Sequence, residues 1–289
     1  MKTLFVAPTG DIKSLTSISL ALVEALRKAG LSVGFVRPIG EDNNRSEQLY
    51  RELFNDESPS PILEGEVNNA IRNGSYDDLL EAVVGRATEA AKGHDIVVVE
   101  GLTYHNTRPY THDLNADIAR TLCAGVVFAG NSLANTPEEV AAHFDLNAYI
   151  YSESHIWLAG YIINHVKDPK AIEKTVTFCQ TDFCRSLDTL GIVPENESLK
   201  DDLAAIRFIA QHLNVERLVK ELKTQGTDRM PPSAFRYKLI QSAQKADRRI
   251  VLPEGDEPRT LRAAAICAER GIARCVLLGD VAAIDCQST

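Results

Sequence analysis

The stretch that most constrains the fold is the N-terminal segment, in which a short apolar run leads through a glycine turn into a helix. Residues 3–8, TLFVAP, have the composition of a buried strand that ends in a turn at Gly10. Residues 15–29 repeat apolar side chains at helical spacing, and Gly30 is placed to end that helix. The run LSVGFVRPI then has the composition of a second strand. A strand, a helix and a further strand in this order form a βαβ unit, which predicts a parallel sheet.

The same alternation of strands and helices continues along the chain. Further strands are predicted in HDIVVVEG, GVVFAGN, WLAGYIINHV and LDTLGIVPE. Helices are predicted in SYDDLLEAVVGRATEAAK, with Ser75 as its N-cap, and in TPEEVAAHFDL, with Thr136 as cap and Pro137 at the first helical position. Residues 41–61 are polar and predict a surface loop, whereas residues 201–223 predict one charged helix. The alternation predicts a doubly wound α/β fold with a mostly parallel sheet.

A change in composition divides the chain after this α/β fold. Residues 223–232 are rich in helix breakers and predict a linker between a first domain at 1–222 and a second at 233–289. The second domain repeats helix, strand, helix and strand, which is one further βαβ segment. We expect it to be incomplete, because a lone βαβ segment leaves sheet edges and helix faces uncovered.

The loop between the first strand and the first helix has the layout of a phosphate-binding loop. Such loops curl backbone N–H groups around phosphates, and a hydroxyl at the helix start holds Mg²⁺. Thr9 and Gly10 open the turn, Ser14 lies where such a loop has its second glycine, and Thr16 and Ser17 stand at the helix start. With the helix N-terminus, these residues are candidates for weak nucleotide or anion binding.

The same loop lacks the lysine that neutralises the terminal phosphates in nucleotide-hydrolysing proteins. Leu15 occupies that position, Lys13 lies two residues earlier, and Asp11 adds a negative charge where a phosphate would dock. The missing lysine removes a charge-assisted hydrogen bond of roughly 1.5–3 kcal/mol. Because the transition state of phosphoryl transfer depends on that charge, the loop favours a structural role over nucleotide hydrolysis and leaves weak anion binding open.

Several predicted strands end in a polar residue at what should be one edge of the sheet. Thr9 follows the first strand, Arg37 the second, Glu100 ends IVVVE, and Asn164 ends a later strand. In α/β proteins ligands bind at the carboxyl ends of parallel strands. Glu100 is placed to hold Mg²⁺ or to cap a loop, and Asn164 to contact a base. Arg37, Glu100 and Asn164 therefore join the candidate nucleotide- or anion-binding residues.

Charge and cysteine content narrow the classes of partner. The formal net charge of −9 disfavours general binding to nucleic acid or to anionic membranes. No apolar run approaches the ~20 residues that span a bilayer. The N-terminus lacks the longer apolar region of a signal peptide, so we expect a cytoplasmic protein. The six cysteines form no C-x-x-C pair, and we assign no metal site and no cofactor.

The order of several segments resembles a known family. The N-terminal loop followed by VRPI, DIVVVEGL, LNADIARTL, NTPEEV and GYIINHV resembles the N-terminal domain of long bacterial phosphate acetyltransferases. That domain is similar to the P-loop domains of dethiobiotin synthetase and cobyrinic acid diamide synthase. Phosphate acetyltransferases typically carry leucine in place of the P-loop lysine, as at Leu15 here.

The C-terminal part carries a second resemblance. Residues 231–280 closely resemble the opening of the phosphate acetyl/butyryltransferase catalytic domain, chiefly through LPEGDEPRTLRAA. Long members place a regulatory domain between the two segments and continue with a long region whose serine, arginine and aspartate side chains do the chemistry. The resemblance implies that this chain lacks those catalytic residues. Glu254, Asp256 and Arg259 follow a predicted strand and are candidates for the rim of a CoA or phosphate site, or for helix capping.

The resemblance implies transfer of an acetyl group from acetyl-CoA to inorganic phosphate, which gives acetyl phosphate and CoA by direct attack in a ternary complex. We expect this chain to be cut short and inactive by itself, with acetyl-CoA, CoA and phosphate as partners of the intact enzyme. One alternative is a regulatory, nucleotide-sensing or oligomerisation module, for which a homo-oligomer is open. Another is a synthetase of the dethiobiotin type, which Leu15 disfavours.

Overall fold

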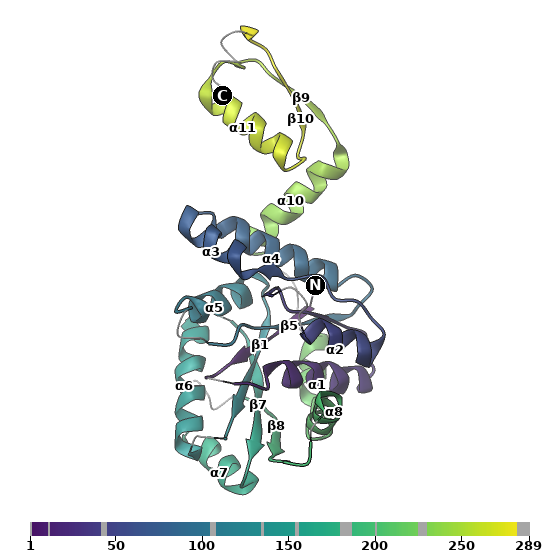
Figure 1. Ribbon diagram of the computed structural model, residues 1–289, viewed down its shortest axis with the longest axis vertical. Coiled ribbons are helices and arrows are strands. Elements are labelled where there is room, and N and C mark those ends of the chain that lie inside the picture. The colour runs from purple at the N-terminus through teal and green to yellow at the C-terminus, as the bar shows by residue number, and fades with distance from the viewer. Residues whose placement is uncertain are drawn as a thin grey trace. The chain divides into compact units, whose positions relative to one another are not determined.

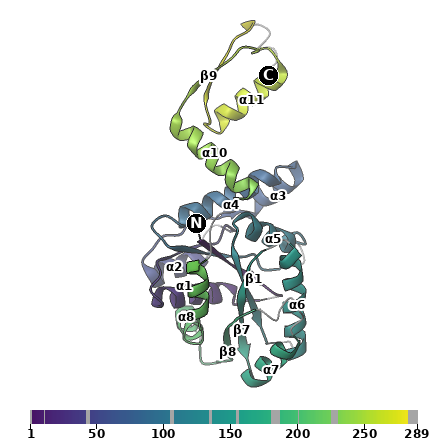
Figure 2. The same ribbon diagram turned by 180° about the vertical axis from the view of Figure 1, so that it is seen from behind.

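The structure, a computed structural model, is shown in Figures 1 and 2. The chain divides into two compact units, Met1–Ser233 and Ala234–Thr289, which are described separately. The structure describes residues 2–10, 12–41, 45–104, 108–133, 136–153, 156–179, 187–199, 201–224 and 230–281.

A six-stranded parallel sheet forms the centre of the first unit, with its strands in the order β2-β5-β1-β6-β7-β8. The strands are β1 Lys2–Pro8, β2 Val33–Val36, β5 Ile96–Glu100, β6 Gly125–Asn131, β7 Leu158–Val166 and β8 Thr189–Pro194. A short parallel pair joins β3 (Ile39–Gly40) to β4 (Ile62–Leu63). From β1 the chain crosses to β2 on one side, and from β6 it crosses to β7 on the other. The carboxyl ends of β1 and β6 therefore form the switch point at which such sheets bind ligands.

Helices cover both faces of this sheet, as Figures 1 and 2 show. One face carries α1 Leu15–Lys28, α2 Arg45–Phe54, α8 Asp202–Gln211 and α9 Glu216–Thr224, whose buried side chains share one apolar core. The other face carries α4 Tyr76–Ala90, α5 Thr111–Thr121, α6 Pro137–Glu153 and α7 Pro169–Cys179, and α3 Glu64–Asn73 packs on α4. This arrangement confirms the predicted doubly wound α/β fold with a mostly parallel sheet.

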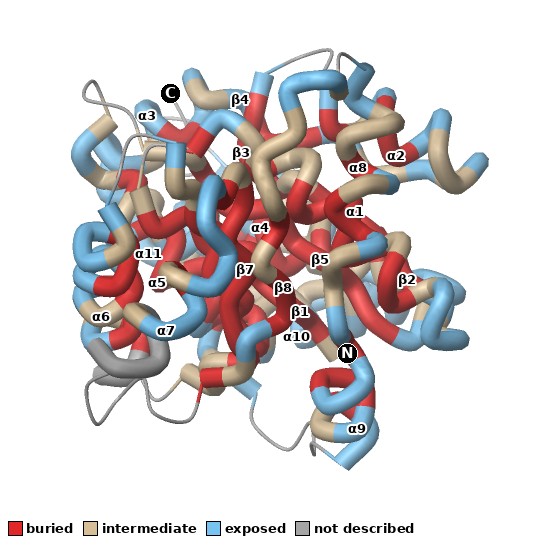
Figure 3. The backbone as a smooth tube through the Cα atoms, turned by 90° about the horizontal axis from the view of Figure 1, so that it is seen from below, coloured by how far each residue is buried: buried red, intermediate tan, exposed pale blue. Residues whose placement is uncertain are grey.

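Burial on both faces explains the apolar runs of the central strands. Leu4 and Val6 belong to the core on the α1 side, whereas Phe5 and Ala7 alternate with them and are equally buried, all at 0% exposure. Every residue of β5 is buried as well. In Figure 3 the strands of this sheet are accordingly coloured mostly red.

Residues 41–61 do not form one surface loop, so that prediction was wrong. The chain forms α2 within this range and reaches β4 just after it. Leu49 and Tyr50 are buried in the α1-side core, and Leu53, four residues after Leu49, packs against that core. This helical spacing gives α2 a narrow apolar stripe that its many polar residues obscure in the sequence.

The single helix predicted over residues 201–223 was also wrong. α8 ends at Gln211 and α9 begins at Glu216. Between them the N–H of Asn214 donates to the carbonyl of Leu190 (2.8 Å), and Leu213 forms an antiparallel bridge with Gly191 of β8. The helix stops here because its chain pairs with the outer strand of the sheet.

The two predicted helix starts differ in their side-chain bonds. The Thr136 hydroxyl accepts a hydrogen bond from the N–H of Glu139 (3.3 Å), and the Glu139 carboxylate accepts one from the N–H of Thr136 (2.7 Å). This reciprocal pair is a capping box and confirms the predicted cap of α6. Ser75 does precede α4, but its side chain makes no capping bond and instead donates to the carbonyl of Ala70 (3.5 Å).

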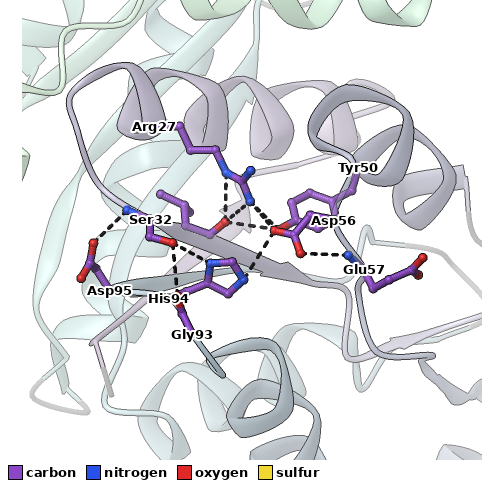
Figure 4. A network of polar contacts seen from close by, with 9 residues as sticks. Arg27, Ser32, Tyr50, Asp56, Glu57, Gly93, His94 and Asp95 are labelled. Carbon is purple, nitrogen blue, oxygen red and sulfur yellow. Dashed lines mark hydrogen bonds and ion pairs between the residues drawn. The ribbon is translucent and has the colours of Figure 1, made fainter.

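A polar network ties the end of α1 to α2 and to the start of β2 (Figure 4). Nη2 of Arg27 donates to the carbonyl of Val33 (2.6 Å), the hydroxyl of Tyr50 (2.8 Å) and Oδ2 of Asp56 (2.6 Å). The Tyr50 hydroxyl donates to the same carboxylate oxygen (2.7 Å), and Nε2 of His94 lies 3.5 Å from it. Burial, and next the hydrogen bond to Asp56, raise the pKa of Tyr50 well above its usual value, so the phenol stays a donor.

The second unit is a small βαβ segment preceded by a helix. Its elements are α10 Pro232–Ala246, β9 Arg249–Leu252, α11 Pro258–Glu269 and β10 Arg274–Leu277. β9 and β10 pair in parallel, and in the described residues they form a sheet of two strands. Neighbouring residues of β9 point to opposite faces, yet Ile250 and Val251 are 46% and 54% exposed. Neither face of this strand is therefore well covered.

The predicted linker at 223–232 contains residues 225–229, which lie outside the described residues, as do Asp11 and the tail from 282. No helix in the described ranges is both long enough and apolar enough to cross a bilayer.

Candidate functional site

A buried carboxylate, Glu100, ends β5 at the carboxyl edge of the sheet. Its side chain is 2% exposed, and Nη1 of Arg37 lies 3.5 Å from its Oε1. The same oxygen accepts hydrogen bonds from the hydroxyls of Thr16 (2.9 Å) and Ser46 (3.2 Å). Burial raises the pKa of Glu100, and the charge of Arg37 and the two hydroxyl bonds act in the opposite direction. The first turns of α1 and α2 and the residue after β2 thus supply donors around one carboxyl group.

Two polar atoms at this place have no hydrogen-bond partner in the residues that the structure describes. Oε2 of Glu100 and Oγ of Ser14, the N-cap residue of α1, are buried without a hydrogen-bond partner in the described part of the chain. Buried polar atoms are nearly always paired, so such atoms call for a water, an ion or a ligand. The start of α1 therefore has unused hydrogen-bonding capacity in addition to its own N–H groups.

The position that holds lysine in a P-loop is filled by a core residue. Leu15 begins α1, is 2% exposed and packs in the α1-side core. Lys13 is exposed. Among the described residues, the cation beside the buried carboxylate is Arg37, which follows β2 and does not belong to the loop.

The loop after β1 is fastened to β6. The N–H and the hydroxyl of Thr9 both donate to the carbonyl of Ala129 (2.9 and 3.2 Å). The next residue of β6, Gly130, packs closely against Thr9: a side-chain carbon at Gly130 would lie 3.1 Å from the Thr9 hydroxyl oxygen. At Gly10 such a carbon would lie 3.6 Å from Nδ1 of His143, so α6 borders the loop at ordinary contact distance. The Thr9 hydroxyl is thus bonded to β6, which lies on the other side of β1 from β5 and its Glu100.

Asn164 occupies a separate place on the sheet edge. It lies in β7, which is separated from β1 by β6, and it is 4% exposed. Its Oδ1 accepts from the N–H of His165 (2.9 Å), and its carbonyl accepts from the N–H of Ser132 (3.0 Å). The second of these bonds links the end of β6 to β7, whereas the first lies within the end of β7 itself.

The structure therefore brings together three of the candidates predicted from sequence, Thr16, Arg37 and Glu100. Ser46 completes the cluster and was missed, because the segment containing it was read as a loop. The helical spacing of the apolar residues in α2 was the signal that could have placed Ser46 near a helix start. Ser14 and Ser17 stand beside the cluster, at the N-cap and in the first turn of α1. Within the described residues, no group of three or more His, Cys, Asp or Glu side chains is placed to hold a metal ion.

No described contact joins the three rim candidates of the second unit into one cluster. Glu254, Asp256 and Arg259 are all exposed. Nε of Arg259 donates to the carboxylate of Glu257 (2.6 Å), and the other oxygen of Glu257 accepts from the N–H of Thr260 (2.9 Å). Glu257 is the N-cap of α11, and Arg259 supports that cap.

Comparison with known proteins bears out the resemblance found in the sequence. Residues 2–202 match the family described as an AAA domain, and residues 234–289 match the family described as a phosphate acetyl/butaryl transferase. A phosphate acetyltransferase of Deinococcus radiodurans is 27% identical, with 96% of this chain and 60% of the relative covered. One from Pseudomonas aeruginosa is 26% identical with the same coverage. This chain thus spans 60% of the length of these relatives.

The alignment with the first relative takes up 420 positions, although this chain has 289 residues. The relative therefore contains long stretches inside the matched region that have no counterpart here. Among solved structures, the MinD cell division protein of Aquifex aeolicus has a TM-score of 0.46 at 14% identity, covering 80% of this chain and 100% of that chain.

Proposed function

The chain belongs to the AAA-domain family and continues from that domain into a phosphate acetyl/butaryl transferase domain, and we propose that the protein serves the transfer of an acetyl group between acetyl-CoA and inorganic phosphate. The observation that supports this is the order of the two domains, which the acetyltransferase relatives share over 96% of this chain. In this reaction a phosphate oxygen attacks the thioester carbonyl, the carbon–sulfur bond breaks and CoA leaves as its thiolate. Acetyl-CoA, CoA and phosphate are then its small-molecule partners, and the cytoplasm is its place.

The 289 residues by themselves are proposed not to catalyse this transfer. Acetyl transfer needs an enclosed pocket that holds the thioester against phosphate, with donors for the developing oxyanion. In the second unit the candidate rim residues are exposed, and the β9 strand has half-exposed apolar residues on both faces. Exposed side chains of this kind do not exclude water from a developing oxyanion.

Purified chain supplied with acetyl-CoA and phosphate is expected to form no acetyl phosphate above a blank without protein. The product is trapped with hydroxylamine and measured as the hydroxamate, with a full-length relative as the positive control. Formation of acetyl phosphate at the rate of that control would contradict inactivity of the isolated chain. Failure of the control relative to react would instead show a faulty assay, so the two results stay distinct.

The Glu100 cluster supports a second role, that of a sensing module for an anionic metabolite. The supporting observation is the Arg37 guanidinium beside the N-terminus of α1, where the Oγ of the N-cap Ser14 has no hydrogen-bond partner among the described residues. Helix N-termini and a neighbouring cation attract phosphate and carboxylate groups. Because Leu15 is buried where a lysine would contact the terminal phosphate, binding without hydrolysis is proposed.

This role is tested by thermal unfolding with millimolar Mg-ATP, NADH or pyruvate. A ligand that binds the folded chain raises the melting midpoint, by an amount equivalent to about 2.7 kcal/mol at a hundredfold excess over Kd. We expect one of these anions to raise the midpoint of the wild type and to raise that of Arg37→Ala less. Arg51→Ala is the matched control, because Arg51 pairs with Glu57 on the surface (3.0 Å). No shift with any of the three ligands would overturn the sensing role and leave the acetyl-transfer proposal untouched.

A further inference from the structure

A tight turn at the end of α11 brings two cysteines of the second unit together. Cys267 lies in the last turn of α11, and Cys275 is the second residue of β10. Between them Gly271 adopts φ of 61°, and the N–H of Ile272 donates to the carbonyl of Cys267 (2.8 Å). The chain thus reverses within a few residues, and the strand returns along the helix it has just left. As a result the thiols of Cys267 and Cys275 are in hydrogen-bond contact.

Reagents in solution can reach this pair. Both cysteines are free thiols of intermediate exposure. A cleft lies between α11 and β10 and is lined by Ala264, Ala268, Arg274 and Cys275 among others. Cys275 itself lines this cleft, and Cys267 is partly exposed. Disulfide formation requires side chains that can meet and a path for the oxidant, and this site has both.

We propose that Cys267 and Cys275 form a reversible disulfide by exchange with a low-molecular-weight disulfide such as oxidised glutathione, and that this bond pins the end of α11 to β10. This is independent of the proposed acetyl transfer. It adds a modification site that involves none of the residues discussed above as binding or rim candidates.

The exchange takes place in two steps. In the first, the thiolate of Cys267 attacks one sulfur of the reagent, a mixed disulfide forms, and one reagent thiolate leaves. In the second, the thiolate of Cys275 attacks the Cys267 sulfur, the protein disulfide forms, and the second reagent thiolate leaves. Each cysteine gives up its proton to solvent or to a departing thiolate. The two cysteines are oxidised by two electrons, and the reagent disulfide is reduced to two thiols.

The environment of Cys275 gives this reaction a pH dependence. Burial, followed by the neighbouring Cys267 sulfur, raises the pKa of the Cys275 thiol above its ordinary value of 9.0. Only the thiolate attacks, so the second step should accelerate as the pH rises toward that range. Once Cys267 is in a mixed disulfide its sulfur carries no negative charge, so the Coulombic part of this effect on the pKa of Cys275 is lost.

The test uses the purified full chain, reduced, freed of reductant and then incubated with oxidised glutathione at pH 8. Free thiols are blocked by alkylation, and the disulfides are located by peptide mapping. Trypsin cuts after Arg270 and Arg274 and so places Cys267 and Cys275 on different peptides. A second digestion, with a protease that cuts before aspartate, cleaves before Asp280 and separates Cys275 from Cys286. We expect a peptide pair linked through Cys267 and Cys275, with a mass lower by about 2 Da for the loss of two hydrogens. Reduction should restore both thiols.

Matched variants separate a specific pair from general oxidation. Cys267→Ser and Cys275→Ser should each retain glutathione on the remaining cysteine as a stable mixed disulfide, because the resolving thiol is missing. Cys123→Ser, which removes an exposed cysteine of the first unit, should form the linked pair like the wild type. In the wild type, stable glutathione adducts on both cysteines, or a bond from either of them to Cys286, would overturn the proposal. So would recovery of both cysteines as free thiols.

Discussion

Replacing Gly34 by alanine is expected to lower the free energy of unfolding of the first unit by roughly 3 kcal/mol, at the upper end for overpacking a tight site. Gly34 lies in β2, where a side-chain carbon would fall well inside contact distance of the carbonyl oxygen of Ala90. The same carbon would lie 2.9 Å from Cδ2 of His94. A backbone carbonyl at the end of α4 cannot move aside as a flexible side chain would, so strand and helix must separate.

Urea denaturation followed by tryptophan fluorescence measures this effect. The chain has one tryptophan, Trp157, which packs against the core of the first unit, so the signal reports on that unit alone. Gly65→Ala is the control, because a side-chain carbon at Gly65 in α3 meets nothing within 4 Å. It should gain about 0.5–1 kcal/mol from helix propensity. Equal stability of Gly34→Ala and wild type would show that β2 and α4 do not approach each other as described.

Removal of Arg27 is the second change with a large expected effect, a loss of about 2–4 kcal/mol. Besides its bonds to Val33, Tyr50 and Asp56, its guanidinium lies 4.6 Å from the ring centre of Phe54. Arg27 and Asp56 are only 26% and 28% exposed, so alanine at position 27 leaves a carboxylate without its main cation in a partly buried place. The apolar part of the arginine also packs, and that contact is lost as well.

Low pH provides an independent check on the same network. Burial alone would raise the pKa of Asp56, but hydrogen bonds from Tyr50 and Arg27 outweigh it and hold that pKa below its ordinary value of 3.8. A carboxyl with a depressed pKa stabilises the fold above its unfolded-state pKa, and this stability is lost as the pH falls through the folded-state value. The stability of wild type relative to Asp56→Asn should therefore be constant near neutral pH and shrink below about pH 4.

Arg51→Ala serves as the surface control for Arg27→Ala. Arg51 pairs with Glu57, and these side chains are 59% and 75% exposed. Exposed ion pairs contribute little, so this variant should stay within about 0.5 kcal/mol of wild type. If Arg27→Ala lowered the free energy of unfolding no more than Arg51→Ala does, the network of Figure 4 would not contribute measurably to the stability of the fold.

The sheet could be predicted from the sequence because its strands are buried on both faces, which produces unbroken apolar runs such as IVVV in β5. α2 was missed, because most of its residues are polar and only a narrow apolar stripe touches the core. The apolar pattern also did not predict the break between α8 and α9, because this break depends on a hydrogen bond from Asn214 to Leu190 on β8. Local propensity carries no trace of such tertiary pairing.

The candidate site was predictable to the extent that carboxyl ends of parallel strands share one edge. Glu100 and Arg37 meet because β5 and β2 are neighbours in the sheet. Asn164 falls elsewhere because β6 separates β7 from β1, and that order is set by crossover connections. Reading the strands in chain order does not reveal which of them become neighbours.

The bridge between Leu213 and Gly191 also determines how molecules can add to one another. An outermost strand displays backbone donors and acceptors that invite a strand from another molecule. At the outermost strand β8, the segment that follows α8 pairs with the strand, and its Asn214 N–H binds the carbonyl of Leu190. In the described part of the second unit, no segment pairs with the outer edges of β9 and β10 in this way. Strand pairing with another molecule is thus obstructed at the β8 edge of the six-stranded sheet, whereas the described edges of the two-stranded sheet remain open to it.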